Sequence, residues 1–167
     1  MAKKQRDGRA TRAKRKPLAI ENQQRTTSIR IGEVDRAFRK ICREVGLRYP
    51  PAAVCFISDG EMKRLNTLYR KKRKTTDVLS FPSEERAQPK GLRSTARVLR
   101  SEFLGDIAIS PRVARRNAKR FGRSIAEEIR ILLLHGVLHL MGYDHESDRG
   151  EMERVEAKLR RRLGLAP

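Results

Sequence analysis

The chain contains no tryptophan, and aromatic residues make up only 5% of its 167 positions. Stacking of nucleic-acid bases on an aromatic platform is therefore not the evident mode of binding. Acidic residues are also scarce, with 20 Asp and Glu against 40 Lys and Arg, which gives a net charge of +20. Such a charge attracts polyanions, and we expect a nucleic-acid partner held mainly through its phosphates. The alternative is a generally arginine-rich surface without a specific partner.

Cysteine and long apolar runs are equally scarce. Cys42 and Cys55 stand thirteen residues apart in apolar surroundings, so they form no Cys-x-x-Cys pair, and we expect buried free thiols. No segment approaches the ~20 apolar residues that a membrane helix needs, and the start of the chain lacks the apolar core of a secretory signal. We therefore expect a cytoplasmic protein with no membrane contact.

The chain has only three histidines, and all of them fall between residues 135 and 145. On a helix, residues four apart share a face, so His135 and His139 can offer two imidazoles to one ion. Gly142 can end that helix in a left-handed turn, which lets His145 fold back as a third ligand. Three ligands leave a tetrahedral zinc one open position, as in catalytic sites. The alternative, that these are core histidines unrelated to a metal, fits the spacing less well.

The segment around these histidines is predicted to be a buried helix. Ser124 with Glu127 three residues later forms a capping box, and the following run to Met141 is apolar on nearly every side. Beyond the helix, Asp144 and Glu146 flank His145. Each is a candidate partner for a ligand, a candidate base or a solvated turn residue, and for Glu146 we favour the solvated turn.

The histidine pattern is close to the long signature of zinc proteases, which carries a glutamate directly after the first histidine. That glutamate is the general base of peptide hydrolysis. Gly136 occupies its position here. The sequence therefore indicates a reaction other than peptide hydrolysis, although a metal-dependent peptide hydrolase stays an alternative hypothesis.

The histidine window, with its Gly-Tyr-Asp before His145, and three further segments together resemble the motifs of one known family. The three segments are residues 65–70 (Leu-Asn-Thr-Leu-Tyr-Arg), 76–82 (Thr-Asp-Val-Leu-Ser-Phe-Pro) and 104–109 (Leu-Gly-Asp-Ile-Ala-Ile). In this order they resemble the YbeY family of zinc-dependent endoribonucleases that mature ribosomal RNA. The similarity covers roughly residues 29–165, and the histidine window is its most specific part. One departure is Thr75, where the family usually has proline.

The resemblance implies one Zn²⁺ per chain, bound by His135, His139 and His145, and a functional arginine, Arg70, that meets the RNA. It implies a single-strand-specific endoribonuclease acting in rRNA processing, at the 3′ end of 16S rRNA, and in ribosome quality control. The implied partners are rRNA, the small ribosomal subunit and a ribosomal protein or GTPase. A guanidinium matches phosphate geometry with paired donors, so Arg70 is the candidate to stabilise the transition state. No residue is assigned as general base.

A second alternative from a different class is a non-catalytic ribosome-assembly factor, in which the zinc mainly braces the fold and the basic surface holds rRNA. Binding of RNA without metal-dependent cleavage would distinguish it. Hydrolysis of a casein or peptide library would distinguish the peptide hydrolase.

We expect two parts in the chain, a basic disordered arm over residues 1–24 and a single zinc-dependent endoribonuclease domain over residues 25–167. Residues 1–17 hold eight basic side chains and one acid with almost no bulky apolar residue, a composition that cannot form a core. We expect this arm to bind RNA phosphates.

The hydrophobic periodicity of the rest predicts an α+β fold, and the resemblance of the histidine pattern to that of zinc proteases implies a zincin-like architecture. About four strands form a mixed sheet that packs with helices around the buried histidine helix. A polar loop is expected over residues 83–101. The expected strands are 28–31, 53–57, 78–81 and 103–109, and the expected helices are 33–45, one capped by Ser58, one starting at Pro111, 124–141 and 148–163.

Overall fold

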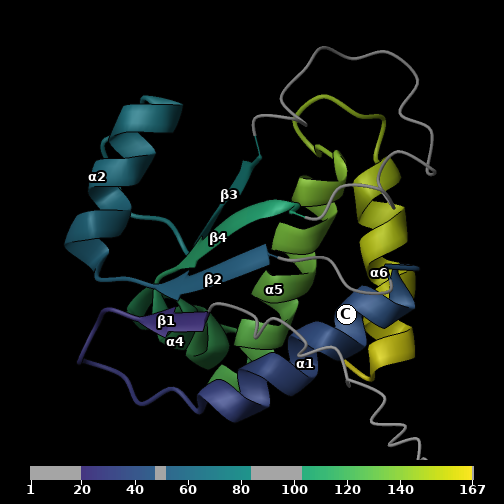
Figure 1. The fold of residues 1–167 in the computed structure, drawn as a ribbon, viewed down its shortest axis with the longest axis horizontal. Coiled ribbons are helices and arrows are strands. Elements are labelled where there is room, and N and C mark those ends of the chain that lie inside the picture. Colours follow the sequence, from purple (N-terminus) through teal and green to yellow (C-terminus); the bar gives the residue numbers. More distant parts are fainter. Residues whose placement is uncertain (1–19, 48–51, 84–102, 167) are drawn as a thin grey trace, which may run out of the picture.

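The computed structural model describes residues 20–47, 52–83 and 103–166 of the chain. Within these ranges the chain forms four strands and five helices (Figure 1). The strands are β1 (Ile20–Asn22), β2 (Ala52–Phe56), β3 (Val78–Pro82) and β4 (Gly105–Ile109). The helices are α1 (Ile31–Glu44), α2 (Asp59–Arg70), α4 (Pro111–Arg120), α5 (Ile125–Met141) and α6 (Glu151–Leu163).

The strands form one mixed sheet in the order β1-β2-β4-β3. β1 pairs with β2 and β2 with β4 in parallel, whereas β3 runs antiparallel to β4. Each parallel pair needs a crossover connection, and these connections contain α1 and α2. β3 forms one edge of the sheet (Figure 1). The predicted α+β fold with a four-stranded mixed sheet is confirmed.

Side-chain caps explain where the helices begin. Ser58, Ser110 and Ser124 each accept a hydrogen bond from the backbone N–H three residues later, at the starts of α2, α4 and α5. Pro111 occupies the first turn of α4, where a missing N–H has no cost. Asp148 caps α6 by accepting from the backbone of Gly150 and the two residues after it. The predicted helix starts at Ser58, Pro111 and Ser124 are therefore confirmed.

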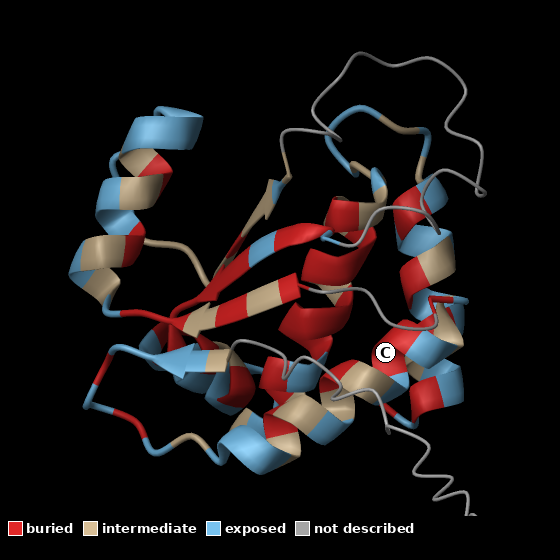
Figure 2. Ribbon diagram, viewed as in Figure 1, coloured by how far each residue is buried: buried red, intermediate tan, exposed pale blue. Residues whose placement is uncertain are grey.

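The main core lies on one face of the sheet and is built around α5. Figure 2 shows α5 buried along nearly its whole length, with α1, α4 and α6 around it. Residues such as Leu133, Leu134 and Leu138 are fully buried, and each contributes about 1.5–3 kcal/mol by leaving water. The opposite face of the sheet carries a smaller cluster in which Met62 of α2 packs against Leu79. The histidine-bearing helix is thus the buried centre of the fold, as expected.

The start of the domain differs from the prediction. Residues 28–30 form no strand; Ile29 packs on the core from an irregular segment, and Ile31 is already the first residue of α1. The strand at this end of the chain is β1, which lies inside the range expected for the basic arm. After β1 the chain turns around Gln24, whose buried side chain accepts hydrogen bonds from the backbone N–H groups of Thr26 and Thr27, both at 3.0 Å. The folded part therefore includes residues 20–24.

Both cysteines are free, and burial raises the pKa of Cys42 to about 12, which leaves it an inert thiol. Most of the loop expected over residues 83–101, and residues 1–19 of the expected arm, lie outside the described residues. Across the described ranges, none of the helices combines the length and the hydropathy required to cross a bilayer.

Candidate metal centre

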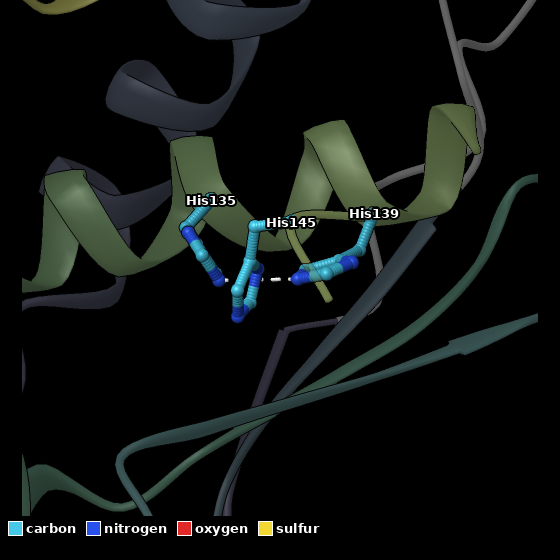
Figure 3. A group of neighbouring side chains, drawn as sticks. All are labelled: His135, His139 and His145. Atoms are coloured by element: carbon cyan, nitrogen blue, oxygen red, sulfur yellow. Dashed lines mark hydrogen bonds between the residues drawn. The ribbon is translucent and has the colours of Figure 1, made fainter. Parts of the chain in front are cut away.

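The three histidines converge on one point, as Figure 3 shows. His135 and His139 lie one turn apart on α5, and their Nε2 atoms are 3.1 Å apart. His145 reaches the same point from the loop after the helix. One nitrogen from each ring lies within 4.8 Å of the others, so the cluster could hold a metal ion. The structure thus brings together all three predicted ligands.

Gly142 makes this convergence possible. It caps α5 with φ 99°, a left-handed conformation that side chains other than glycine rarely adopt. The backbone N–H of Gly142 donates to the carbonyl of His139, and that of Tyr143 donates to Leu138, which closes the turn. Asp144 then fixes the loop by accepting hydrogen bonds from the Glu146 N–H and the Ser147 hydroxyl. His145 is therefore returned to the face that carries the other two rings.

A buried carboxylate from another helix holds His135. The Nδ1 atom of His135 lies 2.9 Å from Oε2 of Glu156 on α6, and Glu156 also pairs with Arg160. Burial alone would raise the pKa of Glu156, but the hydrogen bond with His135 and the charge of Arg160 outweigh it and lower that pKa. The carboxylate thus stays ionised and favours a proton on Nδ1, which leaves Nε2 free to bind a metal.

His139 is half-buried on α5. Burial, with His135 and His145 close by, lowers the pKa of His139 below its ordinary value. The neutral ring is the form whose nitrogen lone pair can coordinate an ion. His139 therefore presents an uncharged nitrogen donor, and imidazole nitrogens are ligands that suit zinc and other transition metals.

The predicted functional arginine lies beside this centre. Arg70 is the last residue of α2, and its guanidinium pairs with the carboxylate of Glu146, 76 residues away and directly after His145. Lys72 approaches the same carboxylate at 3.5 Å. These two cations lower the pKa of Glu146, with the Arg70 hydrogen bond as the largest cause. Glu146 is a solvent-exposed turn residue, as favoured from the sequence, and in addition it links the histidine loop to α2.

The basic loop after Arg70 is held in a defined conformation. Lys71 takes a left-handed conformation at φ 58°, and the buried amide of Asn66 donates a 2.7 Å hydrogen bond to the carbonyl of Lys74. The next residue, Thr75, has a buried hydroxyl without a hydrogen-bond partner among the described residues. Proline, which the family usually has at this position, would leave no such group.

Gly136 packs against the sheet. A Cβ at this position would lie 3.0 Å from Ile107 and 3.2 Å from the hydroxyl of Ser80, two residues that pair across β3 and β4. The Ser80 hydroxyl also donates to the carbonyl of Gly136 at 3.3 Å. A side chain here would require Ile107 and the Ser80 hydroxyl to shift by a few tenths of an ångström. Glycine therefore suits the close contact between α5 and the sheet at the position of the protease glutamate.

The sequence of this chain is similar to a known protein family. The family model described as Endoribonuclease YbeY matches residues 19–164. The chain belongs to this family. Endoribonuclease YbeY of Solibacter usitatus is 42% identical over 138 residues, covering 83% of this chain and 82% of its own. Endoribonuclease YbeY of Nautilia profundicola is 48% identical over 107 residues, covering 64% and 68%.

A solved structure has a similar fold. The solution structure of TM1509 from Thermotoga maritima matches with a TM-score of 0.54 and 26% identity, and the match covers 87% of each chain. The YbeY resemblance inferred from the histidine window and the three shorter segments is therefore confirmed.

Sequence reasoning missed Glu156. The final helix buries Met152, Leu159 and Leu163, and Glu156 lies on that same buried face. An acid within an apolar stripe was the signal that could have found it, because a buried carboxylate needs a partner.

Proposed function

We propose that this protein is a zinc-dependent, single-strand-specific endoribonuclease that processes rRNA, with the 3′ end of 16S rRNA as a substrate and a role in ribosome quality control. The observation that carries the proposal is the convergence of His135, His139 and His145 beside Arg70. Membership of the YbeY endoribonuclease family supports the same reaction class.

The donor set fits one Zn²⁺ per chain. Three imidazole nitrogens match the ligands of catalytic zinc sites, which keep a further position open. His145 is exposed, so the centre is open on its side. When bound, the ion would supply Lewis acidity toward a phosphate oxygen and would acidify water. Elemental content distinguishes zinc from other divalent metals.

The remaining steps belong to side chains of this protein. Glu156 fixes the ring of His135, so the donor atom keeps its direction while substrate binds. Arg70 and Lys72 share the exposed carboxylate of Glu146, and an RNA phosphate is a ligand of the same kind for both cations. We propose that the phosphate replaces Glu146 on Arg70, which then stabilises the charge that develops on the phosphoryl oxygens.

The basic residues before β1 form part of the same proposal. As an arm they would add affinity through phosphate neutralisation without selecting among sequences. We also propose a cytoplasmic location, with the small ribosomal subunit and a ribosomal protein or GTPase as partners.

Cleavage of a defined 16S rRNA precursor tests the proposal. We expect the wild-type protein to cut single-stranded regions, to stop when a chelator is added and to recover with zinc. His139→Ala should bind the RNA and leave it intact. Binding without metal-dependent cleavage by the wild-type protein would support the assembly-factor alternative and overturn the proposal.

A further inference from the structure

Phe121, at the end of α4, is one of the exposed large apolar residues. The residue is 57% exposed. Of the five phenylalanines, Phe38 and Phe56 are by contrast fully buried in the core. Phe121 lies on the turn that leads into α5, before the helix that carries His135 and His139. An exposed aromatic ring on a strongly basic protein is a candidate contact for a partner.

The turn after α4 turns the ring outward. The backbone N–H of Arg123 donates to the carbonyl of Ala118 at 2.9 Å, and Gly122 has φ 66°, which together form a Schellman turn. In this turn the residue in the position of Arg123 is commonly apolar and packs on the helix. Here that position holds Arg123, and the large apolar side chain two residues earlier, Phe121, is exposed.

Arg123 forms a rigid support under the ring. Its Nε atom donates to the carboxylate of Glu128 at 2.6 Å, and the two side chains are only 11% and 3% exposed. A buried ion pair of this kind is fixed in position, because losing either partner would leave an uncompensated charge. The Arg123 guanidinium lies 4.7 Å from the Phe121 ring centroid, within cation–π range. The Phe121 ring therefore packs against the guanidinium of Arg123, which the ion pair with Glu128 holds in place.

Positive charge surrounds the exposed ring. The sequence of α4 contains no acid and ends in Lys119 and Arg120. Earlier in the helix, Arg112 and Arg116 lie near Asp59, at 3.6 and 4.0 Å. Among the described residues neither Lys119 nor Arg120 takes part in an ion pair, and the Arg120 guanidinium lies 5.4 Å from the ring centroid. The site therefore combines an exposed aromatic residue with two cations, one of which, Arg120, itself lies over the ring.

We propose that Phe121, Arg120 and Lys119 form a second RNA contact, in which an unpaired base stacks on Phe121 and the adjacent phosphates bind the two cations. This set, with its support Arg123–Glu128, is called the Phe121 platform below. Aromatic stacking beside a basic groove is the general way in which proteins bind single-stranded nucleic acid. Bases within a duplex are already stacked, so the platform selects single strands.

The platform lies apart from the metal centre. Ile125 begins α5 just after the platform, and His135 is ten residues further along, which corresponds to about 15 Å at 1.5 Å per residue. A base on Phe121 therefore does not touch the reacting phosphate. The platform changes RNA affinity and leaves turnover at saturating RNA unchanged. The inference rests on the proposed function, since it adds a second binding site for the RNA substrate of the same enzyme.

The test measures binding of an unstructured single-stranded RNA of about 12 nucleotides by fluorescence anisotropy, with and without chelator. Phe121→Ala should weaken binding by about 5- to 100-fold, the range measured for loss of one stacked base. Phe121→Leu is the matched control, because it keeps apolar bulk and loses the ring, and it should lose nearly as much affinity. Thermal melts of all variants establish that they are folded.

The salt dependence of RNA affinity distinguishes base stacking from charge attraction. Between about 50 and 200 mM salt, the penalty of Lys119→Gln should shrink, because it arises from phosphate neutralisation, while the penalty of Phe121→Ala should persist. Phe121→Trp gives a direct readout, since the chain has no tryptophan and the single indole should be quenched when a base stacks on it.

The outcomes distinguish this inference from the proposed function. Equal RNA affinity of wild type and Phe121→Ala, with unchanged Phe121→Trp emission on RNA addition, overturns the platform even if cleavage is metal-dependent. Weakened binding of Phe121→Ala supports the platform even if no cleavage is seen. A fall in turnover at saturating RNA, with affinity unchanged, also contradicts it.

Discussion

The two sides of the metal centre differ in burial and in what holds them. On one side, His135 is bound to Glu156, whose side chain is 11% exposed and which also pairs with Arg160. On the other, His145 is followed by Glu146, which is 53% exposed and pairs with Arg70 and Lys72. Both sides use a carboxylate, but one carboxylate is enclosed between helices and the other faces water.

This difference indicates two separate roles. An enclosed, hydrogen-bonded carboxylate keeps a metal ligand in place and is costly to disturb. An exposed ion pair contributes little stability, so a phosphate can replace its anion easily. We infer that the Glu156 side holds the ion and the Arg70 side receives the RNA. The predictions below test this division, from the largest expected effect to the smallest.

Loss of a ligand should abolish the centre. His139→Ala removes one of three nitrogen donors, and a site with three protein ligands seldom tolerates such a loss. Elemental analysis should find about one zinc per wild-type chain and essentially none in the variant. Wild-type protein that carries no transition metal, and takes up none when zinc is added, would contradict the metal assignment.

Loss of Arg70 should affect chemistry and spare the metal. Arg70→Ala should slow single-turnover cleavage at saturating RNA by roughly 10²–10³, the usual cost of losing one donor to the transition state. Arg70→Lys should recover only part of the rate, since an ammonium keeps the charge without the paired donors.

Arg73 provides the control for this prediction. It lies in the same exposed basic loop, so Arg73→Ala should mainly weaken binding in a salt-dependent way. Equal rate losses for Arg70→Ala and Arg73→Ala, or none for either, would show that Arg70 is one member of a diffuse basic patch.

Loss of the Glu156 carboxylate should weaken metal binding. Glu156→Gln removes the negative charge that fixes His135 and pairs with Arg160, and zinc affinity should fall by about 10- to 100-fold. Competition with a chromophoric chelator measures this affinity. Glu153→Gln, an exposed acid on the same helix, is the matched control and should leave zinc affinity unchanged. Equal affinity of wild type and Glu156→Gln would remove the proposed role of Glu156.

Loss of the Glu146 carboxylate should slightly raise RNA affinity, whereas the substitutions above lower a rate or an affinity. Glu146→Gln frees Arg70 and Lys72 from an exposed carboxylate that competes with phosphate, so RNA should bind up to about fivefold more tightly. The comparison with Glu153→Gln corrects for the change in net charge. Weaker RNA binding by Glu146→Gln would mean that this carboxylate positions Arg70 for RNA instead of competing with it.

The smallest effect concerns Thr75. Its buried hydroxyl has no partner among the described residues, so Thr75→Val should raise the free energy of unfolding by about 1 kcal/mol. Urea denaturation measures the change. A loss of stability in Thr75→Val would indicate that the hydroxyl has a partner, such as an ordered water.

Local sequence signals predicted much of this molecule. The spacing of His135 and His139, the glycine that ends α5 and the serine caps depend on residues within a turn or two, and the structure has them as expected. Strand β1 was missed because three residues carry too weak a pattern, and its pairing with β2 is a tertiary contact. The pairing of Arg70 with Glu146 joins positions 76 residues apart, and no periodicity encodes such a contact.

The most direct test of the division between the two sides measures two quantities in the same two variants. These are the zinc dissociation constant and the single-turnover cleavage rate at saturating RNA, for Arg70→Ala and Glu156→Gln. The account predicts that Arg70→Ala lowers the rate with wild-type zinc affinity. It predicts that Glu156→Gln lowers zinc affinity and recovers most of its rate when zinc is saturating. If both variants lose zinc affinity and rate together, the two sides form one unit, and the division proposed here is contradicted.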